Sequence, residues 1–86
     1  MWKIVITKEA KKDLKKIAFG GLTEKLIYLI EIIQNDPLKV PPAYEKLHGK
    51  LDGYYSRRIN IQHRLVYQIY NKQSTVKIIR MWTHYE

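Results

Sequence analysis

The apolar positions along this chain change their period near its middle. In the first half they recur every three or four residues, which is the spacing of an amphipathic helix. In the second half they form short runs rich in β-branched and aromatic residues, which is typical of strands. The pattern therefore predicts helices in the first half and a β-sheet built mostly from the second half.

Two helices are predicted. The first begins at Lys8, after a candidate N-cap at Thr7, and ends at Gly20-Gly21. Its apolar stripe contains Ala10, Leu14, Ile17 and Ala18, and its opposite face contains Lys11, Lys12, Lys15 and Lys16. The second runs from about Leu22 to Gln34 and stops at Asn35-Asp36-Pro37. Its stripe contains Leu22, Leu26, Leu29, Ile30 and Ile33, so the two helices are expected to form a hairpin.

Four strands are predicted around these helices. One lies at the N-terminus, from Trp2 to Thr7, and three follow the helices: Tyr54 to Ile59, Arg64 to Tyr70 and Val76 to Trp82. The short turns between the last three require antiparallel pairing. The proline-containing segment from Pro37 to Lys50 is expected to be an ordered loop or a single short strand that displays Glu45.

These elements predict an α+β fold, in which two N-terminal helices pack on one face of a mostly antiparallel sheet of about four strands. The other face remains free to bind a partner. A chain of 86 residues can close one hydrophobic core, so residues 1–86 are expected to form a single domain.

The amino-acid composition limits the reactions and cofactors that this protein can use. The absence of cysteine excludes disulfides, thiolate catalysis and Cys-ligated metals, and three separated histidines give little support to a metal site, so no cofactor is expected. The apolar run near the N-terminus is too short for a signal peptide, and a cytoplasmic protein without membrane contact is expected.

The net charge is large for so small a protein. Sixteen Lys and Arg against eight Asp and Glu give a formal charge of +8, which predicts a polyanionic partner. Charge alone leaves open a non-catalytic module that only binds RNA or DNA backbone.

Four side chains are candidates for catalysis or substrate binding. Glu45 is either a general base or a solvated partner of neighbouring lysines, and Arg64 is either a phosphate ligand or an edge-facing charge. His84 is either a general acid or part of a tail, and Tyr85 is either a stacking platform or a cover for the core. Cleavage of RNA through its 2′-hydroxyl needs a base, a cation and an acid together, and all three types are present.

The segment YEKLHGKLDGYYSRRINIQHRLVYQIY, followed by a terminal His-Tyr, resembles the YoeB/Txe branch of the RelE-like bacterial toxins. The resemblance spans about Tyr44 to Tyr85, and the order strand–helix–helix agrees before it. It implies a ribosome-dependent mRNA endonuclease that cuts mRNA in the ribosomal A site. It also implies neutralisation by a cognate YefM/Axe-like antitoxin and allows a homodimer.

Carried over by position, the resemblance makes Glu45 the base, Arg64 the transition-state cation and His84 the acid. Tyr85 becomes the aromatic that orients a base, and no metal is implied. The implied substrate contacts also include Arg58, His48 and Lys50.

Two positions depart from the family pattern. His48 stands where the resemblance implies a lysine, and Glu86 follows the usual terminal tyrosine. Alternation along the strand predicts that Arg57 and Arg58 point to opposite faces, so only one of them is expected to face RNA.

Besides the toxin, the sequence leaves two alternatives, a basic RNA-binding module without catalysis and an inert toxin-like protein.

Overall fold

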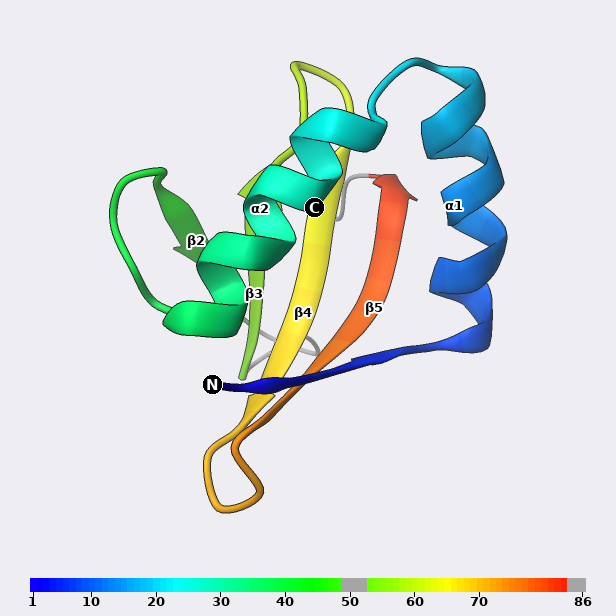
Figure 1. The fold of residues 1–86 in the computed structure, drawn as a ribbon. Coiled ribbons are helices and arrows are strands. Elements are labelled where there is room, and N and C mark those ends of the chain that lie inside the picture. Colours follow the sequence, from blue (N-terminus) through cyan, green and yellow to red (C-terminus); the bar gives the residue numbers. More distant parts are fainter. Residues whose placement is uncertain (49–52, 84–86) are drawn as a thin grey trace.

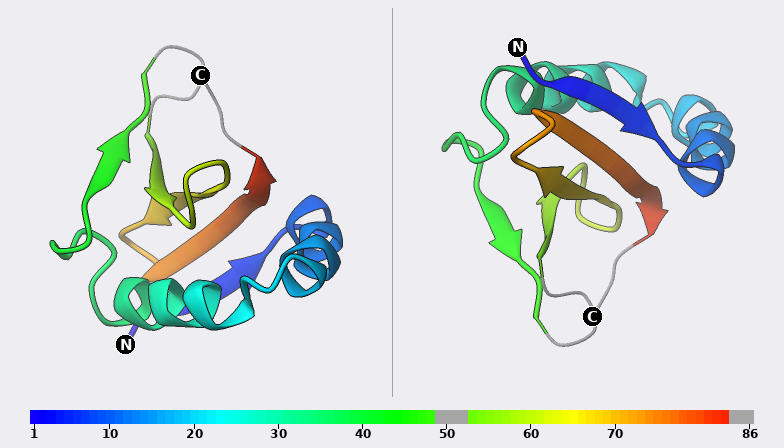
Figure 2. Two further views of the ribbon diagram at one scale, coloured as in Figure 1. Left: turned by 90° about the horizontal axis from the view of Figure 1, so that it is seen from above. Right: turned by 90° about the horizontal axis from the view of Figure 1, so that it is seen from below.

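The computed structural model describes residues 1–48 and 53–83. Its elements are β1 (Lys3–Ile6), α1 (Lys8–Phe19), α2 (Thr23–Asn35), β2 (Tyr44–Lys46), β3 (Tyr54–Arg58), β4 (Arg64–Tyr70) and β5 (Thr75–Thr83). Both helices lie on the same side of a strongly curved sheet (Figures 1 and 2). The predicted α+β class and layer arrangement are confirmed.

The sheet has five strands in the order β1-β5-β4-β3-β2, so the expectation of about four was one too low. The additional strand is β2, which pairs antiparallel with β3 and brings Glu45 opposite Ser56. Pairing of β3 with β4 and of β4 with β5 is also antiparallel. The pairing of β1 with β5 is parallel, which needs a long connection, and both helices and three strands separate the two in the chain.

The ends of α1 follow from local sequence. The Thr7 hydroxyl caps the helix by accepting a hydrogen bond from the Ala10 N–H at 3.0 Å. At the other end Gly21 has φ +72, and the N–H groups of Gly21 and Leu22 donate to the carbonyls of Ala18 and Ile17. These two bonds form a Schellman motif, which explains why the glycine pair ends the helix.

The buried face of α1 differs from the predicted stripe. Ala10 and Ile17 are buried as expected, but Leu14 is 37 % exposed and Ala18 is also exposed. The third buried position is Asp13, whose carboxylate accepts hydrogen bonds from Arg80 Nε at 2.8 Å and from the Met81 N–H at 3.0 Å. The stripe prediction was wrong at Leu14 and Ala18, because the face of α1 that meets the sheet includes Asp13, whose charge is paired with Arg80 of β5.

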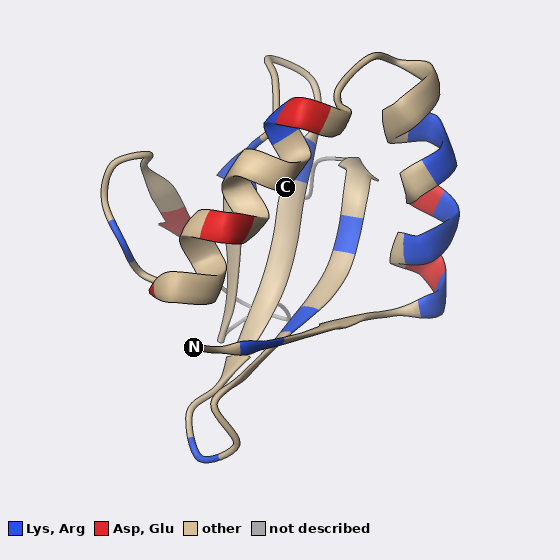
Figure 3. Cartoon of the chain, viewed as in Figure 1, with Lys and Arg blue, Asp and Glu red and all other residues tan. Residues whose placement is uncertain are grey.

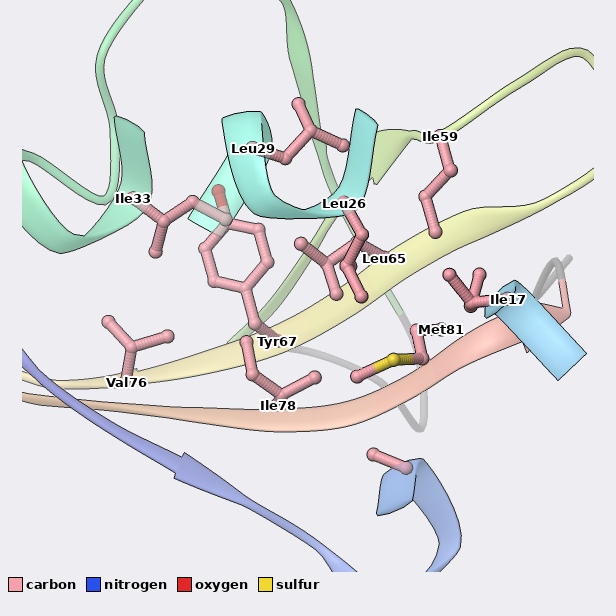
Figure 4. Close-up of a cluster of buried hydrophobic side chains, with 11 residues drawn as sticks. Ile17, Leu26, Leu29, Ile33, Ile59, Leu65, Tyr67, Val76, Ile78 and Met81 are labelled. Atoms are coloured by element: carbon pink, nitrogen blue, oxygen red, sulfur yellow. The ribbon is translucent and has the colours of Figure 1, made fainter. Parts of the chain in front are cut away.

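The core lies between α2 and the sheet. Leu26, Leu29 and Ile33 project from α2 toward β4 (Figure 4). All three are at most 3 % exposed, and burial of one such side chain stabilises a fold by about 1.5–3 kcal/mol. They meet a floor of strand residues that contains Leu65, Tyr67, Val76, Ile78 and Met81. This core fixes the strands that carry the polar groups described next.

Candidate functional site

A cleft of about 630 Å³ opens between the beginning of α2, β2 and the loop that joins β3 to β4. Its lining comprises Lys25, Pro42, Ala43, Tyr44, Glu45, Ser56, Arg58, Ile59, Asn60, Ile61 and Arg64. Three of the predicted site residues, Glu45, Arg58 and Arg64, therefore share one cleft. Because α2 contributes a wall, the cleft is not confined to the sheet face that the helices leave uncovered.

Glu45 and Arg64 form an ion pair in this cleft. Arg64 Nη1 donates a hydrogen bond to Glu45 Oε1 at 2.9 Å, and the same nitrogen lies 3.5 Å from Ser56 Oγ. The Glu45 side chain is 62 % exposed and the Arg64 side chain 22 % exposed. A carboxylate and a guanidinium thus stand side by side, and both are accessible to a ligand.

The backbone around Arg64 is irregular. Arg64 is paired with Thr83 of β5, and the β4–β5 register shifts between Arg64 and Val66 and again between Val66 and Tyr67. Such bulges re-aim side chains and are frequent beside active sites. Thr83 immediately precedes His84 in the sequence. The pairing of β4 with β5 therefore places Arg64, the candidate cation, opposite the residue that comes before His84, the candidate acid.

The two neighbouring arginines of β3 have different surroundings. Arg57 is 1 % exposed and donates hydrogen bonds to the carbonyls of Pro42 and Pro37 and to the Tyr67 hydroxyl. Arg58 is exposed and lines the cleft. The alternation predicted from the sequence is confirmed, and Arg57 has a structural role.

Arg57 and Tyr67 together hold the segment that leads into β2. The Tyr67 hydroxyl donates to the Pro37 carbonyl at 2.8 Å while it accepts from Arg57 Nε at 3.0 Å. Burial raises the pKa of Tyr67 above its ordinary value of 10.0 and outweighs the opposing effect of Arg57, so the hydroxyl keeps its proton and remains a donor. This network fixes the backbone that positions Glu45.

The other predicted site residues are not gathered in this cleft. His48 is exposed, follows β2 and does not belong to the cleft lining. Lys50, His84 and Tyr85 lie outside the described residues. Their predicted roles therefore remain predictions.

Sequence reasoning missed Lys25 and Asn60, which also line the cleft. Lys25 comes from α2, and its Nζ lies 5.4 Å from the centre of the Tyr28 ring. The side-chain oxygen Oδ1 of Asn60 accepts hydrogen bonds from the N–H groups of Gln62 and His63, which shapes the turn before Arg64. Asparagine is a known turn signal, whereas no sequence pattern indicates that Lys25 reaches this cleft.

A stacked pair of rings, one buried and one partly buried, supports the same region and was not predicted from the sequence. The His63 ring stacks on Trp82 with 3.8 Å between ring centres and an angle of 18° between planes. His63 is 8 % exposed, and its Nδ1 has no hydrogen-bond partner among the described residues. The pair ties the residue before Arg64 to the end of β5.

The groups in the cleft suit an anionic ligand. Two guanidinium groups and one ammonium group surround a single carboxylate, and arginine binds phosphate with a planar set of donors. Within residues 1–48 and 53–83, no group of three or more His, Cys, Asp or Glu side chains is suited to hold a metal ion. In the same residues, no helix is long and apolar enough to cross a membrane.

The fold and the cleft define a small basic α+β protein in which cations stand beside an accessible carboxylate. The family model of the YoeB-like toxin of bacterial type II toxin–antitoxin systems matches residues 7–85 of this chain. The chain therefore belongs to the YoeB-like toxins, and the resemblance seen in the sequence is confirmed.

Individual relatives agree with this assignment. Toxin YoeB of Synechocystis sp. is 40 % identical over 65 residues, which cover 76 % of this chain and 73 % of the relative. The structure of a YoeB/ParE toxin from Agrobacterium tumefaciens matches with a TM-score of 0.87 and 29 % identity, covering 96 % of this chain and 99 % of the other. A chain of the heterotetrameric YoeB–YefM complex from Staphylococcus aureus matches with a TM-score of 0.81 and 33 % identity, over 99 % of both chains. A YoeB dimer from the same organism has a TM-score of 0.82 and 33 % identity, over 98 % of both chains.

Proposed function

We propose that this toxin is a ribosome-dependent mRNA endonuclease that cleaves mRNA in the A site by attack of a 2′-hydroxyl. The observation that carries the proposal is the accessible Glu45–Arg64 pair, 2.9 Å apart, in a cleft that also contains Arg58 and Lys25. A base next to a phosphate-binding cation is what this reaction requires at its first step.

In the proposed reaction Glu45 removes the proton of the 2′-hydroxyl, and the 2′-oxygen forms a bond to phosphorus. Arg64 neutralises the charge that develops on the phosphate oxygens. The bond from phosphorus to the 5′-oxygen breaks, and His84 donates a proton to that oxygen. The products are a 2′,3′-cyclic phosphate and a 5′-hydroxyl.

The remaining predicted residues act on the substrate without taking part in proton transfer. Tyr85 stacks on a base, as aromatic rings in RNA-binding proteins do. Arg58, Lys50 and, when charged, His48 contact phosphates, and Lys25 joins them from α2. The Glu45–Arg64 hydrogen bond then competes with the substrate, so phosphate binding to Arg64 also frees the carboxylate to act as a base.

We also propose that a cognate YefM-like antitoxin neutralises the toxin and that the free toxin forms a homodimer. Support comes from the S. aureus relatives, which form a complex with YefM and a dimer. The +8 charge of this chain favours a partner with acidic segments.

The test is cleavage of a defined mRNA on purified ribosomes stalled with a chosen codon in the A site. His84→Gln and Glu45→Gln are each expected to lower the rate constant by about 10²–10⁴-fold, the usual range for a lost acid–base catalyst. Glu31→Gln is the matched control, since it makes the same chemical change at an exposed position of α2 outside the cleft. Binding to ribosomes without cleavage by the wild-type protein would favour the non-catalytic RNA-binding module instead.

A further inference from the structure

A second cleft lies where the end of α1 meets the end of β5, two elements that lie side by side in Figure 1. Its volume is about 360 Å³, and its lining consists of Lys15, Lys16, Phe19, Gly20 and Trp82. None of these residues lines the cleft around Glu45 and Arg64. The proposed RNA cleavage therefore makes no use of it.

The wall of this second cleft is fixed before any ligand arrives. Trp82 is held on one side by its stack with the buried His63. Toward the helix, a Cβ on Gly20 would come within 3.0 Å of Trp82 Cη2, so the ring packs against the helix end only because residue 20 has no side chain. A preorganised wall lowers the entropic cost of binding.

Phe19 forms the exposed side of the cleft. Its side chain is 93 % exposed, although it belongs to a helix that buries Ala10, Asp13 and Ile17 on its other face. A single exposed apolar residue is ordinary by itself. Here it stands beside Trp82 at a hollow, and large aromatic residues around a pocket are typical of the energetic centre of a protein interface.

The helix face next to the cleft is strongly basic, as Figure 3 shows along the outer side of α1. Its exposed cations are Lys8, Lys11, Lys12, Lys15 and Lys16. Of the two carboxylates of α1, Glu9 lies in the first turn, far from the cleft, and Asp13 is buried in its pair with Arg80. The rim is therefore complementary to an acidic ligand.

The chemistry of the lining favours a protein over a nucleic acid. Aromatic rings also stack on bases in RNA-binding proteins, but interfaces with nucleic acids are on the whole more polar than interfaces between proteins, which have an apolar centre with charges at the rim. The second cleft is lined by the apolar groups of Phe19, Gly20 and Trp82, and the ammonium groups of Lys15 and Lys16 supply the charge.

We propose that this cleft anchors an acidic segment of a partner protein, which inserts one large apolar side chain between Phe19 and Trp82 and directs carboxylates to Lys15 and Lys16. The inference rests on the proposed function in one respect, since the partner with this chemistry is the antitoxin. Anchoring here leaves the rest of the segment to cover the cleft around Glu45 and Arg64. Two linked contacts raise the affinity above that of either contact alone.

The experiment measures binding of the full-length toxin to its cognate YefM-like antitoxin, together with ribosomal cleavage by the free toxin. Phe19→Ala is expected to weaken antitoxin binding by at least about 10-fold, as for a residue at an interface hot spot, without changing cleavage. Folding is preserved because Phe19 is exposed. Ile27→Ala, at a half-exposed position of α2, is the matched control and is expected to bind normally.

A second variant tests the rim. Lys15→Gln combined with Lys16→Gln is expected to weaken antitoxin binding and to reduce its dependence on salt. Equal antitoxin affinity of Phe19→Ala and wild type would overturn the inference, as would a loss of ribosome association with antitoxin binding intact, which would assign the cleft to RNA. Failure of the wild-type toxin to bind the antitoxin at all would instead contradict the proposed partner.

Discussion

Two ion pairs in this protein have the same chemistry and opposite surroundings. Asp13 is buried in α1 and accepts hydrogen bonds from Arg80 and from the Met81 N–H of β5. Glu45 is 62 % exposed and, among the residues that the structure describes, is paired with the Arg64 guanidinium in a cleft. The first pair joins a helix to the sheet, and the second remains open to a ligand.

Burial decides whether each ion pair stabilises the fold or remains available to a ligand. Burial raises the pKa of Asp13, but the hydrogen bonds from Arg80 and Met81 and the charges of Arg80 and Lys16 outweigh it, so the pKa lies below its ordinary value of 3.8. Breaking such a pair leaves an uncompensated charge inside the fold. An exposed pair contributes little to stability, which leaves Glu45 and Arg64 available for function.

The largest effect is expected from Arg64→Lys, which keeps the charge but removes the planar set of donors. Ribosomal cleavage is expected to fall on the order of 10³-fold, as for other arginines that stabilise a phosphoryl transition state. The melting temperature is expected to stay close to that of the wild type. Unchanged turnover would mean that only a diffuse positive potential is needed, and would make Arg64 a binding residue.

Asp13→Ala is expected to have the opposite effects, a large loss of stability with little change in cleavage. It removes the buried carboxylate and should lower the free energy of unfolding by about 3 kcal/mol, the lower end of the range for a broken buried pair, because the Arg80 side chain is 32 % exposed. Cleavage per folded molecule should persist below the lowered melting temperature. Urea titration measures the first quantity, and a stability equal to that of the wild type would show that the pair does not hold α1.

Acidic pH is expected to remove the stabilisation that the Asp13 pair provides. Because the pKa of Asp13 is lowered in the folded state, its stabilisation is fully present above about pH 4 and is lost as the pH falls through the lowered value. The difference in unfolding free energy between the wild type and Asp13→Asn should therefore shrink below pH 4. A difference that stays constant from pH 7 to pH 3 would contradict the lowered pKa.

The smallest effect is expected from Glu45→Gln on stability. An exposed pair is worth less than about 1 kcal/mol, so the unfolding free energy should match that of the control Glu31→Gln within this margin, at low and high salt alike. The same variant is expected to lose most of its cleavage activity. A destabilisation as large as that of Asp13→Ala would assign Glu45 a structural role.

Much of the fold could be predicted from local sequence. The cap at Thr7, the stop at Gly20-Gly21 and the bounds of β4 agree with the structure to within a residue, because each depends on neighbours in the chain. The alternation of Arg57 and Arg58 also followed from the strand period alone. The predicted catalytic set was reached through the family resemblance, and the residue types alone left its roles open.

What the sequence could not determine depends on contacts between distant segments. The strand β2 is only three residues long and exists because β3 pairs with it, and Asp13 is buried because Arg80, 67 residues later, meets it across the fold. For the same reason Lys25 lines the cleft around Glu45 and Arg64, and Trp82 lines the second cleft together with Phe19. Local periodicity fixes which residues form an element and where it ends. Only the packed structure decides which charges are buried and which remain exposed, since burial is a property of the neighbours that the fold supplies.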